Sequence, residues 1–290
     1  FDTLVIAVDQ HYYEIIETIS RVCGDEKLHR EQIVKYDAFF ADELKELERL
    51  EQQELQKCGM RFSLDDLDFL SNKKFSEQYR LQLTNRPVVC RRVKRLLTIV
   101  EGKSCMHIGC CDHLPMIETK VRLKNWLHGL LEENCKEVLG IDIDEEAVTY
   151  VNEKGFAASK VYCADVTAPD FTDRVPKKDL DYVLLGEIVE HVDNPVSFLS
   201  GLRENMVKYG FHGKYIITVP NAFAIMREGS TYGDGVEKIN SDHRYWFTPY
   251  TIAKVMTLAG IQPEELFFAN DERFPVEKGF QSDRLVVVGK

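Results

Sequence analysis

The spacing of hydrophobic and polar positions changes near residue 100. Upstream, residues 9–58 contain few helix-breaking residues, and their apolar positions recur at helical spacing between charged ones. Residues 61–80 are interrupted and indicate short helices. Residues 86–102 predict one amphipathic helix with Pro87 in its first turn and Gly102 at its end. The first hundred residues therefore predict an α-helical N-terminal region.

Downstream, short apolar runs alternate with helical segments. Five runs belong to strand–helix units and two more close the chain, which predicts seven strands at residues 103–108, 137–143, 160–165, 179–187, 213–221, 265–270 and 283–290. Helices are predicted over about 114–134, 144–155, 193–210 and 248–260. This alternation is typical of an α/β fold, a Rossmann-like, doubly wound and mostly parallel sheet. Because no helix separates the last two runs, we expect the last strand to be antiparallel. We divide the chain into residues 1–100 and a domain over residues 101–290.

Composition and charge narrow the function classes. The chain has 290 residues, 44% of them hydrophobic, and a formal net charge of −11, which argues against nucleic acid as its main partner. No run of eighteen apolar residues predicts a membrane span, and the sequence opens without the basic segment of a signal peptide. The eight cysteines form no C-x-x-C pair, which favours reduced thiols in a cytoplasmic protein.

Glycines, acids and histidines follow the predicted strands where each one ends. In an open parallel sheet, ligands bind beyond the carboxyl ends of the strands, so these residues are the candidates for a site. In chain order they are Gly109 to His113, Asp142, Asp165, Gly186-Glu187 with Glu190-His191, and Pro220-Asn221.

Three of these positions together favour a ligand that contains adenosine. A glycine after the first strand permits a tight turn, a carboxylate after the second suits the two ribose hydroxyls, and Asp165 could accept from an exocyclic amine. A dinucleotide fits less well, because two glycines of the G-x-G-x-x-G pattern are replaced by Cys111 and His113. A cationic sulfonium nucleoside needs no phosphate cradle and suits an acidic chain.

The sequence resembles class I S-adenosylmethionine-dependent methyltransferases, the broad group that includes small-molecule and ubiquinone-pathway enzymes. The resemblance lies in "CMHIGCCDHL", "VLGIDIDEEAVTYV", "YCADV" and "DYVLLGEIVEHVDNP", with support from "GKYIITVPN" and "DHRYWFTPYTIAKVMTLAGI". It covers roughly residues 100–290, and "GEIVEHVDNP" and "DHRYWFTP" are its most specific parts. It implies S-adenosyl-L-methionine as the cofactor.

The resemblance also assigns cofactor contacts. Gly109 would face the methionine part, Asp142 the ribose hydroxyls, Ile143 the adenine face, and Glu187 the sulfonium end. The full set that we predict to bind the cofactor is His107, Gly109, Cys110, Cys111, Asp142, Ile143, Asp165, Val166, Gly186 and Glu187. The chain departs from the family pattern at His107, which replaces the usual acid, at the two replaced glycines, and in about a dozen extra residues before Asp142.

Candidate catalytic residues are His191, His243 and Glu187. An imidazole with an ordinary pKa near 6.5 can remove a proton from a hydroxyl acceptor. Alternatively, Glu190 and His191 hold the following loop by hydrogen bonds, and His243 packs among aromatic residues. Cys110-Cys111 is interpreted as a pair of small side chains in a tight turn, not as a redox pair or zinc site, and we expect no bound metal.

Together these features predict an S-adenosylmethionine-dependent methyltransferase, with oxygen of a small molecule or glycan as the expected target. Two alternatives come from other classes: a catalytically degenerate adaptor that binds a protein, and an NAD(P)-binding oxidoreductase. We expect no membrane or nucleic-acid partner. The N-terminal helices are expected to cover the site or to form a homodimer.

Overall fold

A computed structural model describes residues 4–6, 33–35, 59–83, 90–225, 235–236, 239–271 and 279–290. The chain divides into two compact units, Phe1–Gln53 and Glu54–Lys290. The second compact unit begins at Glu54, well before residue 100. The division at residue 100 between a helical region and a methyltransferase-like domain therefore remains a prediction.

In the first unit, the described residues form two short parallel strands, β1 (Leu4–Ile6) and β2 (Ile33–Lys35). The prediction of helix over residues 9–58 is therefore wrong at β2. Two adjacent β-branched residues, Ile33 and Val34, favour a strand once a partner strand is present. The rest of the predicted helix, including its charged part at residues 41–57, lies outside the described residues.

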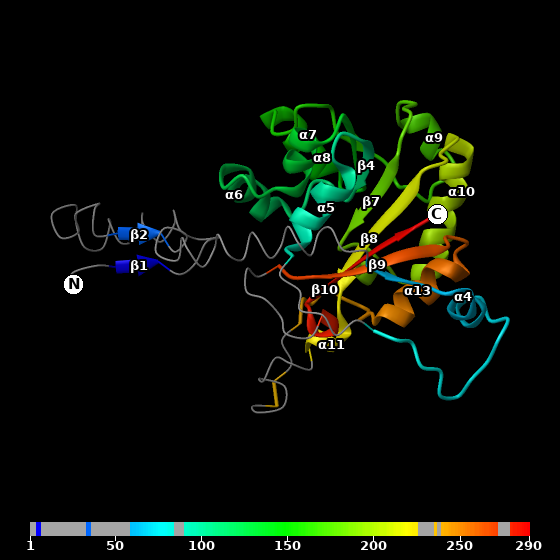
Figure 1. The fold of residues 1–290 in the computed structure, drawn as a ribbon. Helices are drawn as coiled ribbons and strands as arrows, with labels where there is room; N and C mark the ends of the chain where they lie inside the picture. Colours follow the sequence, from blue (N-terminus) through cyan, green and yellow to red (C-terminus); the bar gives the residue numbers. More distant parts are fainter. Residues whose placement is uncertain are drawn as a thin grey trace. The chain divides into compact units, whose positions relative to one another are not determined.

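The second unit is built on an eight-stranded sheet with the order β3-β9-β10-β8-β7-β4-β5-β6 (Figure 1). Its strands are β3 (Met60–Arg61), β4 (Ser104–Ile108), β5 (Glu137–Asp142), β6 (Tyr162–Cys163), β7 (Tyr182–Gly186), β8 (Lys214–Pro220), β9 (Pro263–Ala269) and β10 (Arg284–Gly289). Strands β4 to β8 are parallel, and β10 is antiparallel to both β8 and β9. The predicted Rossmann-like sheet and its antiparallel last strand are confirmed. The eighth strand, β3, pairs antiparallel with β9 and was not predicted.

Both faces of the central strands are buried. Successive side chains of a strand point to opposite faces, and Met106, Val183 and Ile217 belong to one apolar cluster while Cys105 and Leu184 belong to another. Helices cover both clusters, as expected for a mainly parallel sheet. In Figure 1, α10 and α13 lie toward one side of the sheet, and α5 and α7 lie toward the other.

The helices begin and end where their capping residues predict. Asp144 and Thr248 accept hydrogen bonds from the first turns of α8 and α13, and Gly155 ends α8 in the left-handed conformation. The helices are α4 (Leu64–Leu70), α5 (Arg92–Val100), α6 (Leu114–Arg122), α7 (Leu127–Asn134), α8 (Glu145–Lys154), α9 (Phe171–Arg174), α10 (Pro195–Tyr209), α11 (Ala222–Ile225) and α13 (Pro249–Leu258), with 3₁₀ turns η2 (Val189–His191) and η3 (Gly279–Gln281).

Two predicted helices are shorter than expected. The helix predicted over 86–102 begins only at α5, because Arg91 forms a β-bridge with Asn270 and so remains extended. The helix predicted over 114–134 is interrupted between α6 and α7, where Lys124 has a positive φ of 53°. Among the described residues, no helix is both long and apolar enough to cross a membrane.

Candidate active site at the carboxyl ends of the strands

The strand order reverses beside β4. Strands β5 and β6 lie on one side of β4, and β7 and β8 lie on the other. Gly109 follows β4, Asp142 ends β5, Asp165 follows β6 and Glu187 follows β7. Because parallel strands end at the same edge of a sheet, the reversal brings these predicted residues to one edge, at the position where open α/β sheets bind ligands.

The turn after β4 requires a glycine. Gly109 has φ +70°, and a Cβ atom placed on it would lie 2.6 Å from Cδ1 of Ile188. Its N–H donates to the carbonyl of Ile141 at 2.8 Å, which holds the turn against β5. A side chain at this position would therefore be strained by the backbone and would collide with Ile188, so only a glycine fits without a shift.

The carboxylate of Asp142 connects the loops that follow β4 and β5. Its Oδ2 accepts from the N–H of Cys111 at 2.9 Å, and its Oδ1 accepts from the N–H of Asp144 at 3.1 Å. Each carboxylate oxygen has a second lone pair, so both can still accept a hydrogen bond from a hydroxyl.

The residues predicted to meet adenine differ in exposure. The side chain of Ile143 is 70% exposed, which is unusual for a large apolar residue next to a buried strand. Asp165 is also exposed, and its Oδ1 accepts from the N–H and hydroxyl of Thr167 at 2.8 and 2.7 Å. Val166 is buried in the core, so only its backbone lies close to this edge.

His107 does not reach the strand-end edge. Strand alternation turns its ring toward α7, where its Nδ1 lies 3.2 Å from Nδ1 of His128. Burial lowers the pKa of His107 well below its usual value and lowers the pKa of His128 to about 4. Two neutral rings this close share one hydrogen between their Nδ1 atoms. The predicted cofactor contact of His107 is therefore replaced by a structural role beneath the Gly109 turn.

The two adjacent cysteines are packed inside the same turn. Cys110 and Cys111 are almost fully buried, and their sulfur atoms lie 4.0 Å apart. Burial raises the pKa of the Cys110 thiol well above its ordinary value, and Trp126 donates from Nε1 to the Cys110 carbonyl at 2.9 Å. This environment agrees with small packed side chains, since reactive cysteines need exposure and a lowered pKa.

Glu187 has an unusual conformation directly after Gly186 and β7. Its φ is +57°, in the left-handed region that non-glycine residues seldom adopt. Its carboxylate accepts from the hydroxyl of Thr218 at 2.8 Å and forms an ion pair with Nε of Arg284 at 2.9 Å. Residues held in this region are concentrated at functional sites.

The next turn, η2, carries a buried carboxylate beside two imidazoles. Glu190 is fully buried, and within the described part of the chain neither of its carboxylate oxygens has a hydrogen-bond partner. Its Oε1 lies 4.0 Å from Nε2 of both His191 and His243. Burial, followed by the charge of Glu187, raises the pKa of Glu190 to about 8.

The surrounding loop fixes the orientation of His191. Its Nδ1 lies 2.9 Å from a carboxylate oxygen of Asp242, and the two imidazole rings of His191 and His243 meet edge to face at 4.7 Å. The N–H of Arg244 donates to the carbonyl of Glu190 at 2.8 Å. Glu190 and His191 thus hold this loop, as one of our two interpretations expected, and they also form a cluster of ligand atoms within 4.8 Å of one another with His243.

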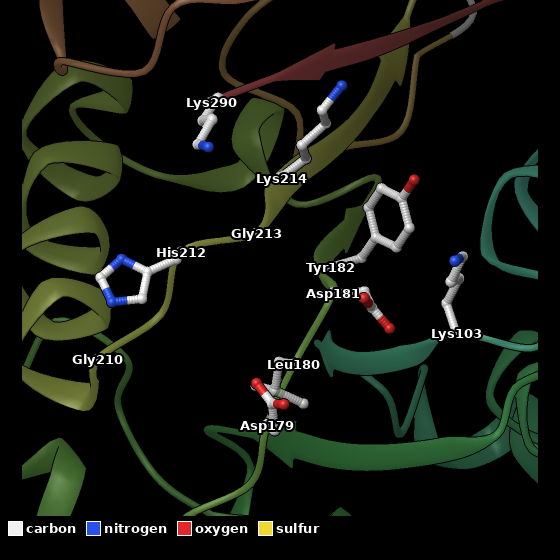
Figure 2. Close-up of a pocket in the computed structure, with 10 residues that line it drawn as sticks. All are labelled: Lys103, Asp179, Leu180, Asp181, Tyr182, Gly210, His212, Gly213, Lys214 and Lys290. Atoms are coloured by element: carbon white, nitrogen blue, oxygen red, sulfur yellow. The ribbon is translucent and has the colours of Figure 1, made fainter.

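A cavity of about 390 Å³ lies at the opposite end of the sheet from these residues. Figure 2 shows its lining at the amino-terminal ends of the parallel strands, including Lys103, Asp181, Tyr182 and Lys214. Two of these side chains have structural partners: Asp181 accepts from the N–H of Ser104 at 2.9 Å, and Lys214 pairs with a glutamate of β9 at 2.6 Å. The predicted site residues do not line this cavity.

Comparison with known proteins identifies a family to which part of the chain is similar. Residues 124–211 match the family model described as a methyltransferase domain. This segment of the chain is therefore similar to a methyltransferase domain. The match implies S-adenosylmethionine as the cofactor, and it includes β5, β6, β7 and α10.

Solved structures with a similar fold are also methyltransferases. A methyltransferase of Haloferax volcanii in complex with the Trm112 methyltransferase activator is 15% identical, covering 68% of this chain and 87% of that one, with a TM-score of 0.44. The small RNA methyltransferase HEN1 is 16% identical over 75% of this chain and 27% of its own, with a TM-score of 0.46. An S-adenosylmethionine-dependent methyltransferase of Aquifex aeolicus is 15% identical over 79% and 98%, with a TM-score of 0.41. At these identities the likeness concerns the fold alone. No curated protein matches the sequence.

Three residues at the strand-end edge received no cofactor or catalytic role from the sequence, although Glu190 is among the candidates that follow the strands. Glu190 carried a signal in the sequence, because it is an acid among the apolar residues Val189 and Val192. Thr218 and Arg284 carried none, since only the strand order brings β8 and β10 beside the end of β7.

Proposed function

We propose that this protein is an S-adenosylmethionine-dependent O-methyltransferase in which Glu190, His191 and His243 activate the acceptor hydroxyl. The observation that supports this most is the buried Glu190 carboxylate, which faces two imidazoles. A buried carboxylate without a hydrogen-bond partner is costly for a fold, so its presence beside a ligand-binding edge suggests a functional role.

The cofactor would lie over the ends of β4, β5 and β6. The Gly109 turn would face the methionine part, and Asp142 has lone pairs for the two ribose hydroxyls. The exposed side chain of Ile143 would cover one face of adenine, and Asp165 would accept from its amine. The carboxylate of Glu187 would lie near the sulfonium, whose positive charge it favours.

The donor set of the cluster fits a divalent cation. Two imidazole nitrogens and one carboxylate are ligands that divalent first-row transition metals such as Mn²⁺, Co²⁺ or Zn²⁺ accept. The contact between His191 Nδ1 and Asp242 is the second interaction that metal-binding histidines usually make, and it leaves Nε2 directed toward Glu190. This grouping leads us to propose a bound metal, although from the sequence alone we expect none. A bound cation would lower the pKa of a coordinated hydroxyl.

The protein's own part in the reaction is then alignment. Methyl transfer is an in-line displacement, so the acceptor oxygen must lie behind the methyl carbon and water must be excluded. His191, on η2, and His243, on the neighbouring loop, would hold the cation, and through it the acceptor oxygen, beside the end of β7. For the acceptor we keep a hydroxyl of a small molecule or glycan.

A methyl-transfer assay with isotopically labelled S-adenosylmethionine tests the proposal. Acceptor arms should contain small diols and phenols, glycans, and RNA, which is included because one similar structure is a small RNA methyltransferase. With the best acceptor, we expect EDTA to abolish transfer and Mn²⁺ or Co²⁺ to restore it. Glu190→Gln should lower the rate by about 100-fold or more.

The matched control is Glu264→Gln, which removes a carboxylate that pairs with Lys214 at the opposite end of the sheet. It should leave transfer unchanged. In both variants the affinity for S-adenosylhomocysteine should stay within about twofold of the wild type, since Glu190 is assigned to the acceptor. Transfer that resists EDTA and survives Glu190→Gln, or a methyl group found on nitrogen or carbon, would contradict the proposal.

A further inference from the structure

Glu187 is held in its left-handed conformation from two sides. On β8, the hydroxyl of Thr218 donates to its Oε1 at 2.8 Å, and the Thr218 carbonyl accepts from the Glu187 N–H at 3.1 Å. On β10, Nε of Arg284 lies 2.9 Å from Oε2. One carboxylate oxygen therefore accepts a hydrogen bond, and the other forms an ion pair in which the Nε–H is not aligned as a hydrogen bond. Together these contacts offset the unfavourable backbone conformation.

Arg284 is itself held by a second layer of charges. Its Nη2 lies 2.7 Å from Oδ2 of Asp271, and Nε of Arg92 donates to Oδ1 of the same carboxylate at 3.1 Å. Arg92, Asp271, Arg284 and Glu187 thus form a chain of alternating charges, which we call the charge chain. Its members are 15–37% exposed, so solvent screens them less than a surface pair.

The antiparallel insertion of β10 explains why Arg284 reaches the site. Arg284 pairs with Pro220 at the carboxyl end of β8 and with Ala269 at the carboxyl end of β9. Because β10 runs opposite to its neighbours, its first residue lies at the same edge of the sheet as the last residues of the parallel strands. The final strand therefore contributes a cation beside the ligand-binding edge.

A cation at this place has an electrostatic reason. Glu187 and Glu190 follow the same strand, and their carboxylates repel each other when both are ionised. Arg284 is paired with Glu187 and lies within electrostatic reach of Glu190, so its positive charge offsets this repulsion. Without it, the Glu187 side chain would lose one of the two groups that fix its direction.

We propose that Arg284 is a positioning residue that orients the Glu187 carboxylate toward the cofactor, and that Asp271 and Arg92 hold Arg284 for this purpose. The proposal rests on the proposed function, because it requires the cofactor's sulfonium end beside Glu187. It adds a residue from the last strand, outside the segment that matches the methyltransferase family model.

A double-mutant cycle read by calorimetric titration with S-adenosylhomocysteine tests this role. We expect Arg284→Gln to weaken binding by about tenfold in the wild-type background and by less than about twofold in the Glu187→Gln background. Arg284→Lys, which keeps the charge, should recover most of the affinity. Arg61→Gln is the matched control, since it removes an exposed arginine that pairs with Glu265 at 2.8 Å near the amino-terminal end of β9, at the opposite edge of the sheet.

Each result has a defined meaning. Equal weakening by Arg284→Gln in both backgrounds would show that Arg284 does not act through Glu187, and unchanged or tighter binding would show that it has no positioning role. Should Arg284→Gln fail to fold, the same cycle with Arg284→Lys gives a smaller expected loss, about threefold, that must also vanish in the Glu187→Gln background. If the wild type itself binds no S-adenosylhomocysteine, the proposed function fails first and this inference fails with it.

Discussion

Acidification should destabilise the fold through the buried histidines beneath the Gly109 turn. His128 is 1% exposed at its side chain, its Nδ1 lies 3.2 Å from Nδ1 of His107, and its pKa is lowered to about 4 by burial. His128→Asn removes the titrating ring and keeps an amide that can bond His107. The variant therefore isolates the contribution of one buried imidazole.

The direction of the pH effect follows from the difference in the pKa of His128 between the unfolded and the folded protein. The unfolded chain takes up a proton on His128 as the pH falls below about 6.5, whereas the folded protein does so only near 4. The contribution of the neutral ring is thus complete above the unfolded pKa and is lost as the pH falls toward the folded one. The full interval corresponds to about 3 kcal/mol of unfolding free energy, of which about 2 kcal/mol is lost by about pH 5.

Urea unfolding at about pH 7.5, 6 and 5 measures this contribution. The wild type should lose about 2 kcal/mol more than His128→Asn between the first and last of these conditions. His212→Asn, at an exposed histidine, is the control and should follow the wild type. If His128→Asn shows the same pH dependence as the wild type, the buried neutral pair does not exist as described.

Three further changes probe the strand-end edge. Gly109→Ala should weaken S-adenosylhomocysteine binding about tenfold and lower the unfolding free energy by about 1–2 kcal/mol. The reason is that the new Cβ would meet Ile188 and that the φ of this residue is positive. Unchanged calorimetric titration and urea unfolding curves would contradict this. Ile143→Ser should weaken binding about threefold by calorimetry while stability stays within about 0.5 kcal/mol, since the side chain is exposed; an unaltered affinity would remove adenine from this position. Cys110 and Cys111 should react with a thiol reagent only when the protein unfolds, because both side chains are buried. The Cys110→Ser and Cys111→Ser variants show which part of the labelling comes from each thiol. Rapid labelling of either cysteine in the folded protein would contradict the packing.

Local signals allowed much of the fold to be predicted. Apolar runs marked the central strands, and Asp144, Gly155 and Thr248 marked helix ends through capping that depends on neighbouring residues alone. The predicted elements were wrong or missing where contacts between residues far apart in the sequence determine the structure. Asn270 draws Arg91 into a bridge that delays the start of α5, and the edge pairing of β3 with β9 needs a partner more than two hundred residues away.

The residues of the candidate site also fall into those that local sequence signals predict and those that depend on distant contacts. Gly109, Asp142 and Asp165 follow predicted strands, so the sequence placed them at one edge before the sheet was known. The direction of His107 depends on which face α7 covers, and the pairing of Glu187 with Arg284 depends on the insertion of β10. Neither can be deduced from spacing. The residue assignments themselves remain predictions until a ligand is measured.

Calorimetric titration with S-adenosylhomocysteine tests the central claim most directly. The account predicts saturable binding of one ligand per chain to the wild type, and a loss of about 100-fold in affinity for a folded Asp142→Ala variant, because two ribose hydrogen bonds to a carboxylate are removed. Absence of binding to the wild type, or equal affinity in Asp142→Ala, would contradict it, and absence would favour the alternative of a non-catalytic adaptor with this fold.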